Sequence, residues 1–171
     1  MLKITNAHRA ALLALILLTG CNSDAPRKMG IQIAYDPVTI ERFRVFPTVE
    51  VDVVPTNETT LKQLEAVEID DYFDPDNVLR DSLRKETCFF GEEDHEAKMP
   101  SKKAKIWDAW LDKYGASHLI LFANLPKDGA KGPDMRKLIL PLAKKRWNTD
   151  EISVSILPTG LMLQTPMLPD D

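Results

Sequence analysis

The sequence lacks long apolar runs, an excess of positive charge and the common catalytic motifs. No stretch reaches the roughly 18 consecutive apolar residues of a transmembrane helix. A formal charge of −4 and a pI of about 5.4 argue against binding to nucleic-acid phosphates, since domains of that class are usually basic. The sequence contains no GxSxG elbow, no phosphate-binding glycine loop and no dinucleotide fingerprint. No motif therefore supports an enzyme or a bound cofactor.

What is present suffices for one folded domain. Hydrophobic residues make up 44% of the chain and charged residues 28%, which is typical of a globular protein and not of a disordered or fibrous one. The length of 171 residues suits one ordinary domain and is too short for two sizeable ones.

The first 20 residues have the anatomy of a signal peptide. Lys3 and Arg9 form a positive region, and residues 10–18 are nine unbroken apolar residues. The tetrapeptide LTGC at 18–21 then resembles the lipobox of bacterial lipoproteins. In that family the signal peptide is cut before the cysteine, whose sulfur carries a diacylglyceryl group and whose new amine receives a further acyl chain. The three acyl chains together anchor the protein stably in the membrane. We expect lipidation of Cys21; the alternative is an ordinary secretory signal with a chance cysteine.

The residue after Cys21 is Asn22, and it bears on the destination of the lipoprotein. In lipoproteins of enteric-type bacteria, Asp at this position favours retention in the inner membrane. Asn22 therefore predicts the periplasmic face of the outer membrane, although Asp24 leaves the inner membrane open. Cleavage removes Lys3 and Arg9 and no acid, so the formal charge falls from −4 to −6. We do not expect so acidic a body to bind a membrane surface by charge.

The remaining chain divides simply. We expect a lipidated tether over 21–29, because 22–28 is polar, then one domain over 30–165 and an acidic, proline-rich tail over 166–171. Lipidation of Cys21 leaves Cys88 without a disulfide partner. The apolar run around Cys88 predicts a small buried side chain.

Short alternating runs predict a mainly β protein. In 48–54, Val49, Val51 and Val53 alternate with Glu50 and Asp52, as in a half-buried strand ended by Pro55. The segment 38–47 is either strand or ordered loop, and 92–101 is a charged loop. The other strands are expected at 30–35, 87–90, 117–125, 136–142, 152–156 and 161–164, and helices at 56–67, 74–83 and 101–114. We expect an antiparallel β-sandwich with short helical insertions; the alternative is a two-layer α+β domain.

Two acidic clusters could in principle bind a metal ion, but neither cluster has the ligand spacing of a known metal site. Residues 92–96 contain four acidic residues and His95 but no motif of the HExxH type. The second cluster could bind calcium but lacks the spacing and the glycine of an EF-hand loop; it consists of Asp70, Asp71, Asp74 and Asp76. A solvated loop and helix capping explain the two groups, and we predict no metal.

Other candidate residues have structural interpretations. Cys88 and His118 could form a nucleophile and base, but both lie in apolar runs and are expected together in the core. Helical spacing places Trp107 and Trp110 in the core as well. The basic runs 102–105 and 144–146 are interpreted as solvated faces.

The order of elements resembles the TssJ family, the outer-membrane lipoproteins of type VI secretion systems. The resemblance covers the lipobox, the strand at 31–35, a proline-containing loop at 36–47, the strand at 49–54 and a helical stretch ending in Tyr72-Phe73. It continues with an apolar strand at 119–123, the pair Arg146-Trp147 and two closing strands. Two features depart from the family: Asp36-Pro37 replaces its asparagine-proline turn, and its Trp-Arg order is inverted.

This resemblance implies a transthyretin-like β-sandwich and a structural, non-enzymatic role. The protein would be a lipid-anchored component of a trans-envelope secretion complex that binds an inner-membrane partner protein. By position, the contacting loop is 36–47, and the implied contact residues are Glu41, Arg42, Phe43, Arg44 and Phe46. Aromatic residues and arginine are enriched in interface cores.

Two other functions stay open at this point. A generic outer-membrane lipoprotein could bind peptidoglycan or a small ligand in a pocket lined by aromatics such as Trp147 and Tyr72. A hydrolase would need an accessible Cys88 beside His118, or an acidic metal site.

Overall fold

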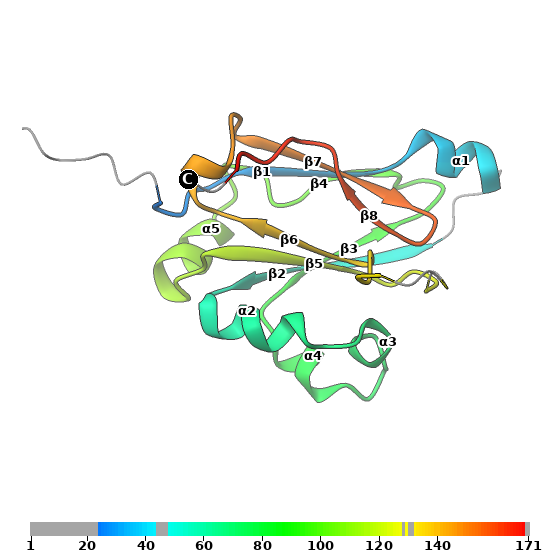
Figure 1. Cartoon of the computed structure of the whole chain (residues 1–171), viewed down its shortest axis with the longest axis horizontal. Helices are drawn as coiled ribbons and strands as arrows, with labels where there is room; N and C mark the ends of the chain where they lie inside the picture. Colours follow the sequence, from blue (N-terminus) through cyan, green and yellow to red (C-terminus); the bar gives the residue numbers. More distant parts are fainter. Residues whose placement is uncertain (1–23, 44–47, 128, 130–131, 170–171) are drawn as a thin grey trace, which may run out of the picture.

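Two four-stranded β-sheets face each other in the computed structural model, which describes residues 24–43, 48–127, 129 and 132–169 (Figure 1). One sheet has the order β4-β1-β7-β8 and the other β3-β2-β5-β6. This arrangement confirms the mainly β sandwich and not the two-layer α+β alternative. The strands are β1 Gly30–Tyr35, β2 Val49–Thr56, β3 Glu86–Phe90, β4 Glu96–Lys98, β5 His118–Ala123, β6 Lys137–Pro141, β7 Glu151–Leu157 and β8 Gly160–Leu163.

The first sheet departs from a purely antiparallel arrangement in one pair. β1 runs parallel to β7, from Gly30 opposite Glu151 to Tyr35 opposite Ile156. The other neighbouring strands in both sheets pair antiparallel, including β4, which lies where we expected only a charged loop. An alternating pattern shows which face of a strand is buried but not the direction of its partner. β4 has no such pattern, because it is a three-residue polar edge strand.

The second sheet places β5 in its interior, as expected from its unbroken apolar sequence. β5 pairs with β2 on one side and β6 on the other. β6 is an edge strand and contains Pro141, which fits the preference of proline for sheet edges.

The main core lies between the two sheets. Ile31 and Ile33 of β1 and Val51 and Val53 of β2 are fully buried in one apolar cluster. Trp107 and Trp110 belong to the same cluster, with ring centroids 5.3 Å apart in an edge-to-face contact. Their helical stripe is therefore in the core, as predicted. It begins as α5 (Ile106–Asp108) and widens into a π-helical turn, η1 (Ala109–Lys113).

Three short helices cover the outer face of the second sheet (Figure 1): α2 Glu58–Glu65, α3 Ile69–Tyr72 and α4 Val78–Ser82. They bury a second cluster that contains Val54, Ile120, Leu64 and Tyr72. No helix in the described ranges is long and apolar enough to cross a membrane.

The expectation that β2 is half-buried is therefore wrong. Asp52 has no exposed surface, because the face that should meet solvent lies under α2 to α4. β2 also continues through Pro55 to Thr56. Side-chain alternation identified the two faces correctly but could not show that a second layer covers the polar one.

Candidate functional site

Residues 24–29, which we call the strap, precede β1 and lie against the β-sandwich. Pro26 forms an antiparallel bridge with Ala143, and the Arg27 amide donates to the Leu142 carbonyl at 3.0 Å. The Arg27 guanidinium binds Asp150 at 2.5 Å and donates to the Thr149 carbonyl at 2.6 Å. These partners lie more than 110 residues away in sequence, so composition could not reveal them.

The strap shortens the expected tether. Lys145 pairs with Asp24 at 2.7 Å, and Met29 is fully buried. Residues 24–29 are therefore attached to the body, although the polar sequence predicted a free linker. Cys21 lies outside the described residues, and its lipidation stays a prediction.

The segment after β1 is a helix, not a strand or loop. α1 spans Pro37–Phe43, and the Asp36 carboxylate accepts from the Val38 amide at 2.9 Å. Aspartate before a proline in the first helical position is an N-terminal helix signal. The sequence-based expectation placed Asp36-Pro37 in a loop and missed this signal.

α1 lies at the end of the sandwich opposite the strap (Figure 1). β1 joins the two, and its six residues rise about 20 Å. Thr39 is buried and donates its hydroxyl to the Ile156 carbonyl at 3.3 Å, which fastens α1 to the end of β7. Val38 has 67% of its surface exposed, and Glu41 is also exposed.

The structure places only part of the predicted contact set. Glu41, Arg42 and Phe43 belong to α1, while Arg44 and Phe46 lie outside the described residues. Val38 is a candidate contact that the sequence analysis did not select. The exposure of Val38 follows from the helix, because Thr39 is the neighbouring residue on the face of α1 that packs against the sandwich. It could therefore be predicted only once the helix was recognised.

Cys88 and His118 do not lie together. Along β2, Cys88 is opposite Val51 and His118 is opposite Thr56, so about 16 Å of strand separates the two positions. Cys88 is 4% exposed, and its thiol donates to the Met99 sulfur at 3.3 Å. His118 is half-buried, with Ser117 Oγ 2.9 Å from its Nδ1. The expectation of adjacent core residues is wrong for His118, and the pair cannot act as nucleophile and base.

Native Cys88 should resist thiol reagents. Burial, with a smaller contribution from Glu86 and Asp52, raises the pKa of its thiol to about 11. The reactive thiolate should therefore be scarce even at pH 9, and the reagent has little access. We expect modification by a maleimide to follow unfolding, as measured by mass spectrometry across a denaturant series. Rapid labelling before the unfolding transition would contradict the buried position.

The acidic residues considered as metal ligands have other partners. The described residues contain no group of three or more His, Cys, Asp and Glu side chains that could hold a metal ion. Asp70 binds Arg136, and Asp74 accepts from the Asp76 amide at 2.8 Å. Residues 92–96 are exposed, and Glu96 pairs with Gln32 across β1 and β4.

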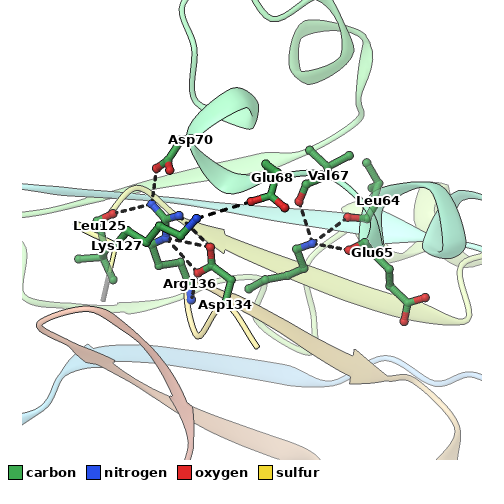
Figure 2. Close-up of polar contacts among 10 residues, drawn as sticks. Leu64, Glu65, Val67, Glu68, Asp70, Leu125, Lys127, Asp134 and Arg136 are labelled. Carbon is green, nitrogen blue, oxygen red and sulfur yellow. Dashed lines mark hydrogen bonds and ion pairs between the residues drawn. The ribbon is translucent and has the colours of Figure 1, made fainter. Parts of the chain in front are cut away.

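A buried arginine holds the loop after β5 against α3 (Figure 2). Arg136 is 2% exposed and binds Asp134 at 2.8 Å, Asp70 at 2.5 Å and the Leu125 carbonyl at 3.1 Å. Its guanidinium holds the pKa of both carboxyl groups below their usual range. The groups satisfy one another, so this cluster is a structural clamp.

Lys137 forms the second half of this clamp (Figure 2). Its ammonium donates to the carbonyls of Leu64, Glu65 and Val67, at 3.2, 2.6 and 2.9 Å, where α2 ends. The last carbonyls of a helix have no amide one turn further on to accept from, and here only the Leu64 carbonyl gains local partners, the amides of Ala66 and Val67. The Lys137 ammonium therefore caps this end of α2 and places a positive charge at the negative end of the helix dipole.

The pocket considered for Trp147 and Tyr72 does not form. Trp147 is buried in the main core and donates its indole N–H to the Pro141 carbonyl at 2.7 Å. Tyr72 is buried in the second cluster, beneath the helices. The two rings therefore lie on different faces of the second sheet and cannot line one ligand site.

Comparison with known proteins finds similar solved structures. No protein-family model and no curated protein matches the sequence. The chain is similar to Lip of Serratia marcescens, described as a membrane-bound component of the type VI secretion system, with 17% identity and a TM-score of 0.47 over 81% of this chain and 96% of Lip. It is also similar to the type VI secretion lipoprotein TssJ1 of Pseudomonas aeruginosa, with 10% identity and a TM-score of 0.45 over 85% and 99%.

Proposed function

We propose that this protein is a lipid-anchored structural component of a type VI secretion complex, held on the periplasmic face of the outer membrane. In this role it binds an inner-membrane partner protein through α1 and the segment that follows. One observation carries the proposal: the strap that follows the lipobox and the helix α1 lie at opposite ends of the sandwich. A body anchored at one end presents the other to the periplasm.

The order of elements supports the choice of secretion system. The lipobox is followed by β1, the proline-containing segment with α1, β2, and helices that end at Tyr72-Phe73. β5, Arg146-Trp147 and the β7–β8 hairpin complete the order on which the resemblance rests. Asp36-Pro37 and the inverted Arg-Trp pair remain departures from the family.

A non-enzymatic role agrees with the chemistry of the described residues. Cys88 is buried away from His118, and Asp52, Asp70 and Asp134 are engaged by arginine side chains. These groups hold the fold together and do not converge on a shared cavity. The proposal needs no cofactor and no metal.

The partner contact can be tested by reversing charge beside α1. We expect Arg42→Glu with Arg44→Glu to weaken recovery of the inner-membrane partner about tenfold or more, as for loss of an interface hot spot. Pull-down from solubilised membranes measures the effect, together with secretion-dependent killing of a competitor strain. Val38→Asp, which places a charge on the exposed turn of α1, should act in the same direction.

A matched variant separates contact from stability. Lys62→Glu reverses an exposed charge on α2, on another face of the molecule, and should leave recovery unchanged. All variants should unfold within about 0.5 kcal/mol of the parent, as surface substitutions do. If the double variant folds, binds and supports secretion like the parent, the segment 36–47 is not the binding surface.

A further inference from the structure

The end of the sandwich that carries the strap is basic, although the chain as a whole is acidic. Eight basic side chains lie in three segments that we call the basic collar: Arg27, Lys28, Lys102, Lys103, Lys105, Lys144, Lys145 and Arg146. The acids in and beside these segments are Asp24, Asp108, Asp150 and Glu151. Asp170 and Asp171 follow in the sequence, outside the described residues.

Ion pairs hold the three segments of the basic collar together. Asp150 binds Arg27 at 2.5 Å and also pairs with Lys102. Lys28 pairs with Asp108, and Lys145 pairs with Asp24 at 2.7 Å. The Lys144 amide donates to the Ala25 carbonyl at 3.3 Å. Segments far apart in the sequence therefore form one surface around the strap.

Part of this positive charge faces solvent. Lys103, Lys105 and Lys144 are exposed and form no ion pair with a described residue, although Lys144 lies near enough to Asp150 to help lower the pKa of its carboxyl group. Within the described part of the chain no carboxylate therefore occupies these three ammonium groups, which are available to external anions.

The strap fixes the distance from this surface to the lipid. Asp24 is held by Lys145, and only three residue steps separate it from Cys21. Three steps reach at most about 10 Å, which is close to one Debye length at physiological ionic strength. Because the folded domain is attached so close to the acyl chains, the basic collar lies within the distance over which its charges interact with the phospholipid headgroups.

A surface hollow beside the basic collar has the mixed lining that suits a phospholipid. It has a volume of about 360 Å³ and is lined by apolar Ile139, Pro141 and Met167 and by basic Lys145 and Arg146. Basic side chains at the edge of an apolar hollow match a phosphate followed by hydrocarbon.

We propose that the basic collar lies against the phospholipid headgroups of the membrane that holds Cys21 and binds their phosphates. This contact orients the sandwich, so that α1 faces away from the membrane. The inference rests on the proposed lipidation of Cys21. It differs from the expectation that an acidic body does not bind a membrane by charge, because that expectation used the net charge of the chain and not the distribution of its charges.

Fluorescence quenching on vesicles tests the orientation. The full lipidated protein is placed in vesicles of phosphatidylethanolamine and phosphatidylglycerol that carry a quencher on their headgroups. A dye is attached at Asn148→Cys, next to the basic collar, or at Val38→Cys on α1. Cys21 carries lipid and Cys88 is buried, so neither competes for the dye. We expect strong quenching at position 148 and little at position 38.

Charge reversal identifies the cause of that orientation. Lys103→Glu with Lys144→Glu should lower quenching at position 148 toward the level at position 38, while the protein stays on the vesicles through its lipid. The matched pair Lys62→Glu with Lys127→Glu, on exposed lysines of other surfaces, should change nothing.

The outcomes separate this inference from the proposed function. Equal quenching at both positions, no effect of the collar variant, or the same effect from the control pair overturns the inference while the anchor stands. Loss of the parent protein from the vesicles overturns lipid anchoring, and the inference with it.

Discussion

Replacing Cys21 with serine is expected to abolish incorporation of radioactive palmitate and to remove the protein from the outer-membrane fraction. The thioether that starts lipoprotein maturation needs the cysteine sulfur, and serine has no equivalent nucleophile. The expected effect is complete because stable anchoring takes more than one acyl chain, and all of them depend on this residue. Labelling in growing cells followed by membrane fractionation measures both losses.

The second cysteine supplies the control for this experiment. Cys88→Ala changes the other thiol of the chain, which is buried and should carry no lipid. It should label like the parent. Palmitate incorporation that persists in Cys21→Ser would show that the LTGC tetrapeptide is not a lipobox, and the proposed location would lose its basis.

Replacing Asp52 with asparagine is expected to lower the free energy of unfolding by about 3 kcal/mol, as for removal of one partner from a buried ion pair. Asp52 is fully buried on β2 and accepts three hydrogen bonds: from Tyr72 at 2.9 Å, Arg80 at 2.8 Å and Thr87 at 2.5 Å. Asparagine keeps the shape of the side chain but leaves the mostly buried Arg80 with Glu50 as its only carboxylate partner among the described residues. Thermal melting should show a Tm roughly 10 °C lower.

Four further variants, including Arg80→Met alone, make the result specific to this network. Tyr72→Phe removes one hydrogen bond and should cost about 1 kcal/mol, and Asp81→Asn, on an exposed carboxylate of α4, should cost almost nothing. Because Asp52 and Arg80 are in contact, Asp52→Asn combined with Arg80→Met should cost less than the sum of the two single changes. Strict additivity, or a cost for Asp52→Asn no larger than for Asp81→Asn, would contradict the network.

The network also explains how the helical layer is attached. Arg80 of α4 reaches Asp52 and Glu50 on β2, and its guanidinium lies 4.6 Å from the centroid of the Phe73 ring. Tyr72 stacks on Phe122 of β5 at 4.2 Å between ring centroids. α3 and α4 are only four and five residues long. Such short helices have little stability of their own and depend on these contacts.

Local patterns in the sequence determined most of the secondary-structure elements, and they also predict the location of the protein. Alternation or unbroken apolar character predicted β1, β2, β3, β5 and the β7–β8 hairpin, because a half-buried or buried strand must repeat with period two or be apolar throughout. The expected signal peptide and the LTGC tetrapeptide would likewise act as linear sequence, and they predict lipidation without any fold. The helix predicted at 56–67 is present as α2, where the Asn57 side chain accepts from the amides of Thr59 and Thr60 as the N-terminal cap.

Only the tertiary structure decided which segments meet. The strap depends on Arg27 reaching residues 147–150, the burial of Asp52 depends on a second layer from α2 to α4, and the basic collar depends on three segments gathering at one end. The prediction that His118 lies in the core was wrong because His118 is the first residue of β5 and is only half-buried. Its burial depends on where β5 begins in the fold and not on the apolar residues that follow it in sequence. Contacts between residues far apart in the chain leave little mark on local composition, because each segment is individually compatible with many partners. The pairing is chosen by the packing of the whole domain.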